Sequence, residues 1–353
     1  MAQGGKSIVV IGAGIIGLTS ALQLQSALGS NSSITIVARD WPSDENVHYT
    51  SPWAGAHGRP FPATSALEIQ QQELSKVTDA VLRSQATSEP ACGVVFMDGY
   101  DYLSCPSEAY THLRGGYGDA EGLQVLPKQE LPKGTNITFG TRYRTWSLNP
   151  PVYCAYLLRK FQLRGGKTLR RSLTCAEEAF SLASNVDTVV NCSGFGFGDP
   201  AFFPIRGQTC LVSNPCDRTI NQLNADGTWT FIIPRPLEGG TIIGGTRESH
   251  DWTEHPRPET RERVLALAAK MYPPILGRDG KFHVIRDIVG RRPARISGFR
   301  LEAEYMKGPH LKGRKIIHAY GAEGFGYAIS WGVAQKVLDL ACGGHDSVAR
   351  PSL

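Results

Sequence analysis

Apolar runs and helical patterns alternate along the first part of the chain. The segment over 7–11 is a continuous, β-branched apolar run, which predicts a parallel strand buried on both faces. A glycine-rich turn over 12–17 follows, and the next apolar positions predict a helix to about Leu28 that ends at Gly29. The run over 34–37 predicts a second strand. Together these segments predict a strand–helix–strand unit with both strands in one parallel sheet.

The rest of the chain repeats these signals, with antiparallel features between them. A helix is predicted over 66–85 because Leu67, Leu74, Val77 and Val81 fall on one helical face. The later predicted elements are short strands and loops over 91–139, a helix from Asn149 to Gly165, a strand over 187–191, an antiparallel hairpin over 231–234 and 241–244, a helix over 259–271, strands over 284–295 and 315–319, a glycine-rich loop over 321–326 and a helix to about Leu340. This order predicts an α/β protein of two interleaved domains, each built from separate segments.

The composition is that of an ordinary globular protein, with 41% hydrophobic and 20% charged residues among 353. At roughly 150 residues per domain, this length predicts about two domains. The net charge is +5, from 37 Lys and Arg against 32 Asp and Glu, and no basic run interrupts the sequence. The pattern disfavours a nucleic-acid partner, whereas the mild basic excess suits an anionic small molecule.

The uncharged stretch over 7–38 superficially resembles a membrane span. Its glycines, together with Thr19 and Gln23, are ill suited to lipid, so we expect a folded strand–turn–helix and no membrane partner. The eight cysteines form no Cys-x-x-Cys pair and show no Cys/His metal spacing. We therefore expect mostly buried, reduced thiols and no bound metal.

The turn over 12–17 reads Gly-Ala-Gly-Ile-Ile-Gly, a Gly-x-Gly-x-x-Gly motif between a strand and a helix. Its three glycines permit a tight turn and the close approach of a pyrophosphate to the helix N-terminus, whereas a purely structural glycine turn is the alternative. At the end of the second strand, Asp40 suits the ribose of an adenosine, and Arg39 suits a 2′-phosphate. These residues predict a dinucleotide and leave NADP open beside NAD and FAD.

Six further segments carry a more specific signal. They are Ser51-Pro-Trp-Ala-Gly-Ala-His57, Asn191-Cys-Ser-Gly194, Pro204-Ile-Arg-Gly-Gln208, Gly244-Gly-Thr-Arg247, Val289-Gly-Arg-Arg-Pro293 and Ile316-Ile-His-Ala-Tyr-Gly321. In this order and over nearly the whole chain, they resemble the D-amino-acid oxidase and D-aspartate oxidase family. The resemblance implies non-covalently bound FAD and oxidation of a D-amino acid to an imino acid. Water would then yield a 2-oxo acid and ammonia, while oxygen takes the flavin electrons and leaves as hydrogen peroxide.

The resemblance also implies a fold and a set of cofactor residues. We expect a Rossmann-like FAD-binding domain with a parallel sheet over 1–58, 141–194 and 288–353. It would interleave with a substrate domain over 59–140 and 195–287, built on a mostly antiparallel sheet. The residues implied at FAD are Gly12, Ala13, Gly14, Ile15, Ile16, Gly17, Arg39, Asp40, Ser51, Gly55, Ala56, Ser193, Gly194, Arg292, Gly324, Phe325, Gly326, Tyr327 and Ala328.

Arg292 matches the family's arginine for the substrate α-carboxylate, which a guanidinium orients through two parallel hydrogen bonds. Its alternative is an ordinary arginine of a surface strand, as its neighbours suggest: Arg286, Arg291, Arg295 and Arg300. Phe231 stands where the family often has a tyrosine for this carboxylate, so Arg292 would bind it alone or with Tyr320. Glu323 replaces a small residue of the family, and we expect its side chain to point away from the flavin. No proton acceptor is assigned, because hydride transfer from a neutral amine needs none.

Three departures from the neutral-substrate oxidases predict a pocket for a second carboxylate. Arg247 stands where those enzymes tend to have an aromatic residue, and D-aspartate oxidases resemble this chain in having arginine there. His57 and Asn221, the latter in a presumed lid over 214–229, add polar groups. Breaking such a buried charge pair costs about 3–5 kcal/mol, enough to select acidic substrates. The alternatives are an Arg247 that caps a hairpin end in solvent, facing Glu248 or Asp251, and a loop His57 whose hydrogen bonds are satisfied within the protein.

The predicted activity is oxidation of D-aspartate, and then D-glutamate, with oxygen as the second partner. The alternatives are an oxidase of neutral D-amino acids, an NADP-dependent dehydrogenase that uses Arg39, and a flavin- or nucleotide-bound sensor without activity. The oligomeric state stays open, with a homo-oligomer among the options. Pro351-Ser352-Leu353 resembles the Ser-Lys-Leu address and predicts the peroxisomal matrix, with the cytoplasm as the alternative.

Overall fold

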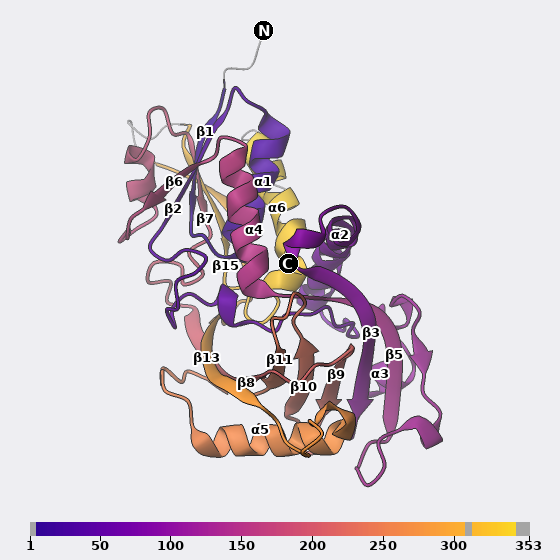
Figure 1. Ribbon diagram of the computed structural model, residues 1–353. Helices are drawn as coiled ribbons and strands as arrows, with labels where there is room; N and C mark the ends of the chain where they lie inside the picture. The colour runs from indigo at the N-terminus through magenta and orange to yellow at the C-terminus, as the bar shows by residue number, and fades with distance from the viewer. Residues whose placement is uncertain (1–4, 308–312, 344–353) are drawn as a thin grey trace.

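Segments from the start, middle and end of the chain meet in one six-stranded sheet. The computed structural model describes residues 5–307 and 313–343. The strands of this sheet are β1 (Ser7–Ile11), β2 (Ser33–Ala38), β6 (Lys167–Arg170), β7 (Thr188–Asn191), β14 (Arg300–Tyr305) and β15 (Lys315–Tyr320). Their order is β14-β15-β7-β1-β2-β6, and all neighbours are parallel except β14 and β15 (Figure 1).

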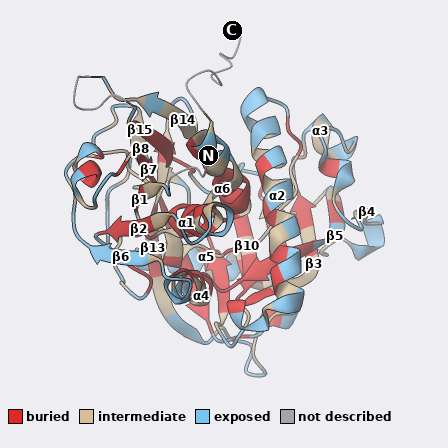
Figure 2. Ribbon diagram, turned by 90° about the horizontal axis from the view of Figure 1, so that it is seen from above, coloured by how far each residue is buried: buried red, intermediate tan, exposed pale blue. Residues whose placement is uncertain are grey.

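Helices cover one face of this sheet. They are α1 (Ile15–Leu28), α4 (Pro150–Leu163) and α6 (Gly326–Cys342), with α2 (Ala66–Ser88) packed on α6 (Figure 1). The opposite face packs against the short helix η5 (Glu177–Ser181) through Ala179 and Phe180. Because the central strands are covered on both faces, they are almost wholly apolar and buried (Figure 2).

Local signals set the ends of these helices. Gly29 ends α1 with a φ of 69°, a conformation that glycine adopts without strain. Ser65 and Glu68 form a reciprocal capping box at the start of α2. Asn149 precedes α4 as the sequence predicts, but its side chain donates to the Pro236 carbonyl at 3.1 Å instead of capping the helix.

A second, mixed sheet of nine strands lies beside the first (Figure 1). Its strands are β3 (Val94–Leu103), β4 (Gln124–Val125), β5 (Phe139–Leu148), β8 (Phe202–Val212), β9 (Arg218–Leu223), β10 (Trp229–Pro234), β11 (Thr241–Gly244), β12 (Glu248–Ser249) and β13 (Val284–Arg295). All pairs are antiparallel except β3 with β9. The path runs β12-β8-β11-β10-β9-β3-β5-β4, and β13 pairs with β8.

Helix α5 (Pro258–Met271) closes the second sheet from below, as Figure 1 shows. Its buried Val264, Ala268 and Met271 form one apolar cluster with strand residues such as Ile220 and Ile232. The remaining short helices are α3 (Glu108–Thr111), η1 (Ser51–Trp53), η2 (Pro90–Cys92), η3 (Tyr117–Asp119), η4 (Lys128–Glu130) and η6 (Pro273–Ile275). The second sheet therefore has an apolar cluster of its own beside α5, while Val94 of β3 and Leu148 of β5 join the main core of the first sheet.

The predicted α/β class, with a parallel and a mostly antiparallel sheet, is confirmed. The predicted domain boundaries need correction at 141 and at 288. Strand β5 spans position 141 and strand β13 spans position 288, yet both pair within the antiparallel sheet. The error has a simple cause: an extended segment pairs with the sheet that its neighbours in space provide, and those neighbours are distant in sequence.

The predicted apolar face of α2 is wrong in part. Leu74 is buried, but Leu67 and Val77 are 40% and 42% exposed. The buried face instead combines Leu74 with Thr78 and Leu82, because the Thr78 hydroxyl binds backbone N–H groups at Trp331 and Gly332 of α6.

All eight cysteines are free thiols, and four of them are buried: Cys92, Cys154, Cys192 and Cys210. In residues 5–307 and 313–343, no helix has both the length and the apolar composition that crossing a bilayer requires. The predicted C-terminal address over 351–353 lies outside the described residues.

Gly332 allows the backbones of α6 and α2 to approach closely, since a Cβ there would lie 2.3 Å from the Leu74 carbonyl oxygen. We expect Gly332→Ala to destabilise the protein by about 1–3 kcal/mol, seen as a lower urea midpoint, because the helices must separate. The control Lys336→Ala, exposed on the same helix, should stay within about 0.5 kcal/mol. An unchanged midpoint for Gly332→Ala would contradict the close contact.

Candidate active site

The glycine motif forms a backbone cradle between β1 and α1. Gly12 has a φ of 100°, and a Cβ there would lie 2.4 Å from the Cys192 carbonyl oxygen. A Cβ on Gly17 would lie 1.9 Å from the Gly12 carbonyl oxygen, so this glycine serves helix–strand packing. Gly14 precedes α1 with no side-chain cap, and Ser51 Oγ accepts the Ile15 N–H at 3.0 Å. The other N–H groups of the first turn are thus available to an anion.

A cavity of about 660 Å³ extends from this cradle. The predicted cofactor residues that line it are Gly12, Ala13, Gly14, Ile15, Ile16, Arg39, Asp40, Ser51, Gly55, Ala56, Ser193, Gly194, Arg292, Gly324, Gly326, Tyr327 and Ala328. Two predicted residues, Gly17 and Phe325, do not line it. Phe325 instead packs edge to face on Phe61, with ring centroids 5.4 Å apart. Lining residues that the sequence did not indicate include Tyr49, Phe195, Phe197 and Trp252.

One end of the cavity lies at the carboxyl end of β2. There Asp40 accepts hydrogen bonds from Asn46 at 3.2 Å and from Arg39 at 2.8 Å. The Arg39 side chain is 52% exposed, whereas that of Asp40 is 14% exposed. Arg39 is therefore paired with the acid beside it, an arrangement that suits a ribose at Asp40 better than a 2′-phosphate at Arg39.

The opposite end of the cavity is built from loops that converge on the start of α6. The loop over 321–326 leads into this helix, whose N-terminus favours negative charge nearby. Tyr327 donates to the Ser51 carbonyl at 2.9 Å, and burial raises the pKa of its hydroxyl well above the ordinary value. Buried Arg235, which the sequence did not single out, donates to the Ala54 and Gly55 carbonyls at 2.6 and 2.9 Å. These contacts fix the cavity wall.

Arg292 reaches the cavity from β13 without a carboxylate partner. Its four arginine neighbours each form an ion pair: Arg286 with Glu45, Arg291 with Glu254, Arg295 with Asp199, and Arg300 with Glu302 and Glu304. In the described part of the chain Arg292 has no such pair, and Nη1 donates to the Thr246 carbonyl at 3.2 Å. Burial lowers the pKa of this guanidinium, which still stays protonated at neutral pH. An unpaired cation in a cavity wall is a site for an anion.

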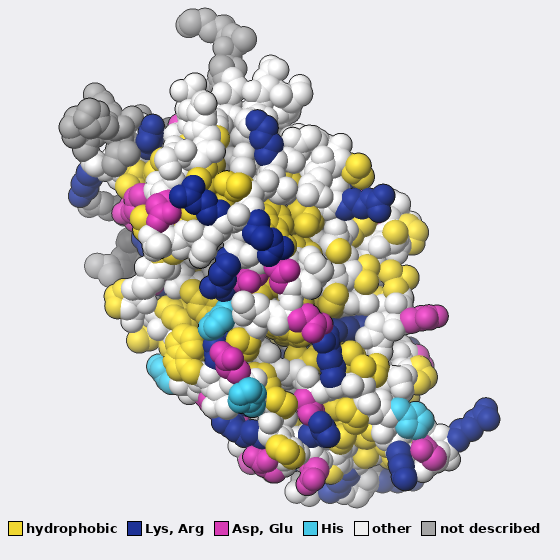
Figure 3. Space-filling view, turned by 60° about the vertical axis from the view of Figure 1, so that its left-hand side comes forward, with side chains coloured by type: hydrophobic (Ala, Val, Ile, Leu, Met, Phe, Trp, Pro, Cys, Tyr) yellow, Lys and Arg dark blue, Asp and Glu magenta, His cyan; other side chains and the backbone are white. Residues whose placement is uncertain are grey.

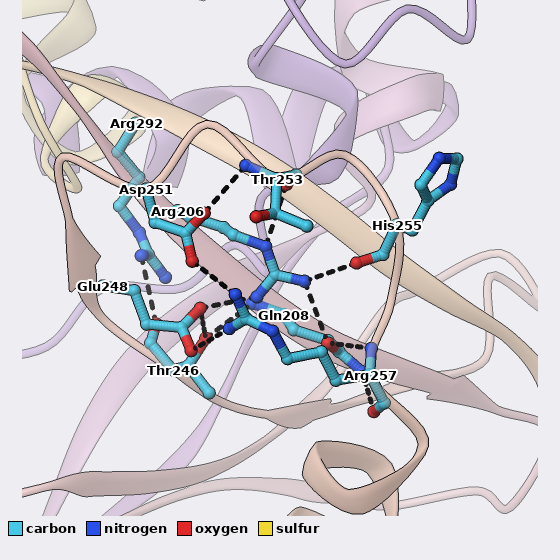
Figure 4. A network of polar contacts seen from close by, with 9 residues as sticks. All are labelled: Arg206, Gln208, Thr246, Glu248, Asp251, Thr253, His255, Arg257 and Arg292. Atoms are coloured by element: carbon cyan, nitrogen blue, oxygen red, sulfur yellow. Dashed lines mark hydrogen bonds and ion pairs between the residues drawn. The ribbon is translucent and has the colours of Figure 1, made fainter.

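Glycine makes the approach of Arg292 to β8 possible. A Cβ on Gly207 would lie 2.6 Å from both terminal nitrogens of the guanidinium. Figure 4 shows the polar network beside it, in which fully buried Arg206 binds Glu248 at 2.5 Å and the Thr253 and His255 carbonyls. This network fixes the loop after β11, and thus the Thr246 carbonyl that Arg292 binds.

His57 and Phe231 both line the cavity, as predicted for residues of a substrate site. The Nδ1 atom of His57 is buried and has no hydrogen-bond partner among the described residues. Burial, and then the positive charge of Arg59, lower the pKa of His57 to about 3, so the imidazole is neutral at physiological pH. A Cβ on Gly244 would lie 2.3 Å from the Phe231 ring, so this glycine makes room for the ring.

The lid predicted over 214–229 is wrong. The centre of this segment is regular sheet, because β9 pairs with both β10 and β3. Asn221 lies in β9, outside the cavity lining, and donates to buried Asp101 at 2.9 Å. Its polarity therefore serves a buried hydrogen bond of the second sheet and not a substrate.

The predicted geometry of two guanidinium groups facing one cavity also needs correction. Arg247 does not line the cavity, and its side chain is 62% exposed. Nη2 and Nε of Arg247 donate to Glu323 Oε1 at 2.7 and 3.2 Å. The Glu323 side chain, which we expected to point away from the flavin, is thus the carboxylate partner of Arg247. No local pattern indicated this pair, because its members lie 76 residues apart.

The model of the FAD dependent oxidoreductase family matches residues 7–340. The chain belongs to this family. A D-aspartate oxidase of Talaromyces thermophilus is 41% identical, with 94% of both chains covered. A D-amino-acid oxidase of Schizosaccharomyces pombe is 31% identical, over 95% of this chain and 96% of the relative. A glycine oxidase structure from Geobacillus kaustophilus shares the fold, with a TM-score of 0.72, 18% identity and coverage of 94% of this chain and 93% of that one.

The cavity of this FAD-dependent oxidoreductase fits its cofactor. The Gly12 cradle and the uncapped α1 N-terminus suit the pyrophosphate, Asp40 suits the ribose, and the loop over 321–326 suits the flavin ring. On the face shown in Figure 3, hydrophobic side chains adjoin Lys, Arg, Asp and Glu of mixed sign. Within residues 5–307 and 313–343, no cluster of three or more His, Cys, Asp or Glu side chains is arranged to hold a metal ion.

Asp40 provides a test of the cofactor site. We expect Asp40→Asn to raise the Kd of FAD about tenfold or more, because a charged acceptor of the ribose hydroxyls is lost. Titration of the apoprotein with FAD, followed by protein fluorescence, measures this Kd. The matched control Glu45→Gln removes a carboxylate that is 63% exposed and lies outside the cavity, and should leave the Kd within about twofold. Equal values for both variants would contradict the assignment.

Proposed function

We propose that this chain is a FAD-dependent oxidase of D-amino acids that prefers acidic substrates, D-aspartate first and D-glutamate second. The observation that carries the proposal is the unpaired Arg292 guanidinium in the cavity wall. It suits the α-carboxylate that every amino acid has, and the relative that is a D-aspartate oxidase supports the acidic preference. The handedness of the substrate rests on the relatives alone.

The residues of the chain bind and orient the substrate in this proposal. Arg292 holds the α-carboxylate, which limits rotation and points the Cα–H bond into the cavity. Phe231 offers an apolar surface and no hydroxyl, so the carboxylate depends on Arg292. FAD, which the Gly12 cradle, Asp40 and the loop over 321–326 would hold, would supply the redox chemistry, namely acceptance of a hydride from the substrate and reduction of oxygen to hydrogen peroxide. Water converts the imino acid to a 2-oxo acid and ammonia.

Two groups support binding of a second carboxylate. Arg247 follows directly after Thr246, whose carbonyl binds Arg292 Nη1, so the backbone of Arg247 lies next to the Arg292 guanidinium. The unpartnered Nδ1 of His57 provides a neutral hydrogen-bonding group in the lining. The alternative, an oxidase of neutral D-amino acids, is favoured by the Arg247–Glu323 pair, which neutralises Arg247.

The expected location of this activity is the peroxisomal matrix. We base this part of the proposal on the terminal Ser352-Leu353 and on the hydrogen peroxide that the reaction releases. Both arguments are independent of the cavity geometry.

The absorption spectrum of the purified protein tests the proposal. We expect a yellow protein whose flavin band bleaches anaerobically with D-aspartate and not with L-aspartate. In air, kcat/KM for D-aspartate should exceed that for D-alanine about tenfold or more, because a second charge-assisted contact contributes about 1.5–3 kcal/mol. An equal or higher kcat/KM with D-alanine would establish the neutral-substrate alternative. A yellow protein that no D-amino acid bleaches would refute both.

The pH dependence tests the role of His57. Because its pKa is about 3, His57 is neutral from pH 5.5 to pH 8. The ratio of kcat/KM for D-aspartate to that for D-alanine should therefore change less than twofold over this range. A histidine near its usual pKa of 6.5 would instead gain charge as the pH falls and raise the ratio. Such a rise in the parent protein, absent from His57→Gln, would contradict a neutral His57.

A further inference from the structure

Glu323 places a carboxylate at the edge of the cavity. Its backbone has a φ of 50°, and its N–H donates to the Pro293 carbonyl at 2.7 Å, directly after Arg292. It is also one of the lining residues, unlike Arg247. The negative charge of Glu323 acts on Arg292 more strongly than that of any other acid and partly opposes the effect of burial on the Arg292 pKa. Glu323 therefore lies within electrostatic reach of Arg292 while it binds Arg247.

The other acids near Arg247 are already occupied. Glu248 binds both Arg206 and Arg257, and Asp251 binds Arg257 at 2.6 Å (Figure 4). In the described chain, Glu323 is the carboxylate with which Arg247 forms an ion pair. A second carboxylate that arrives beside Arg292 would meet an arginine held by a single acid.

The Arg247–Glu323 pair is easily broken. The two side chains are 62% and 35% exposed, and ion pairs with such exposure contribute little to stability. Both hydrogen bonds end on one oxygen, Oε1, so the geometry is not the stronger arrangement in which each carboxylate oxygen takes one N–H. The carboxylate of a bound ligand is thus able to replace Glu323 at small cost.

We propose that Glu323 is a specificity-determining residue that competes with the distal carboxylate of the substrate for Arg247. This inference rests on the proposed function, in which Arg292 holds the α-carboxylate. A dicarboxylate must displace Glu323 to reach Arg247, whereas a monocarboxylate leaves the pair intact. Glu323 therefore weakens the binding of acidic ligands. It also reduces the difference in affinity between acidic and neutral ligands.

Glu323→Gln is the direct test, because it removes the charge and keeps the size of the side chain. We expect the Kd of malonate, followed by the flavin absorbance of the holoenzyme, to fall about two- to fivefold relative to that of propionate. The ratio of kcat/KM for D-aspartate to that for D-alanine should rise by a similar factor. Propionate and D-alanine have only the carboxylate that Arg292 would bind, so they show any effect of the substitution on binding at Arg292 itself. An unchanged or lower preference for the dicarboxylate would overturn the proposal.

A double-mutant cycle separates competition for Arg247 from general repulsion of anions. In an Arg247→Met background, Glu323→Gln should no longer improve malonate over propionate, because the group for which they compete is absent. The same improvement in both backgrounds would overturn the proposal. Glu302→Gln is the matched control: it removes an exposed carboxylate from another arginine and should change the malonate Kd less than twofold.

The malonate measurement needs no turnover, so it distinguishes two kinds of failure. If the holoenzyme oxidises no D-amino acid, the proposed function fails, yet the competition at Arg247 is still measured by the binding of malonate. If D-aspartate is oxidised but Glu323→Gln leaves the malonate Kd unchanged, the proposed role of Glu323 is refuted while the proposed function stands. Circular dichroism and the FAD content of each variant show that the fold and the cofactor are retained.

Discussion

The chemistry of this cavity depends on keeping the Arg292 guanidinium free of any carboxylate of the protein. A cation without a partner in a cavity wall is costly, so it persists only where the fold keeps the nearby acids out of contact with it. On β13 the fold does so by pairing the arginines on either side, Arg291 with Glu254 and Arg295 with Asp199. The Thr246 carbonyl then offers Arg292 a weak, uncharged partner, which leaves most of its donors to a ligand.

The polar network of Figure 4 helps to keep Arg292 without a carboxylate partner from the protein. The loop after β11 supplies the Thr246 carbonyl, and it also brings Glu248 and Asp251 close to the cavity. Arg206 and Arg257 bind both acids, so neither turns toward Arg292. Breaking this arrangement would leave a fully buried Arg206 uncompensated, which is strongly destabilising. The loop after β11 therefore binds Arg292 through the Thr246 carbonyl, while its own carboxylates are kept away from the guanidinium.

The sequence predicted what local patterns determine. The glycine motif, most element boundaries and the role of Arg292 as a cavity residue depend on short segments, and the structure has them in place. Such local patterns do not predict which distant segments of the chain make contact. Arg247 and Glu323 lie 76 residues apart, and Asn221 meets Asp101 across 120 residues. Nothing in the sequence showed that Arg292, among five arginines in 286–300, is the unpaired one, because their acids lie on other elements. The resemblance to a family supplied that choice.

The interleaving of the two sheets links the substrate site to the cofactor loop. Strand β13 pairs with β8 over its length and so belongs to the second sheet. At its end, Arg292 faces the cavity, and the next residue, Pro293, accepts the N–H of Glu323 in the loop that leads into α6. A shift of β13 therefore moves Arg292, the proposed substrate anchor, together with the loop at the proposed flavin end. Because hydride transfer depends on alignment of these two parts, their attachment to a single strand is a physical reason for the interleaved chain.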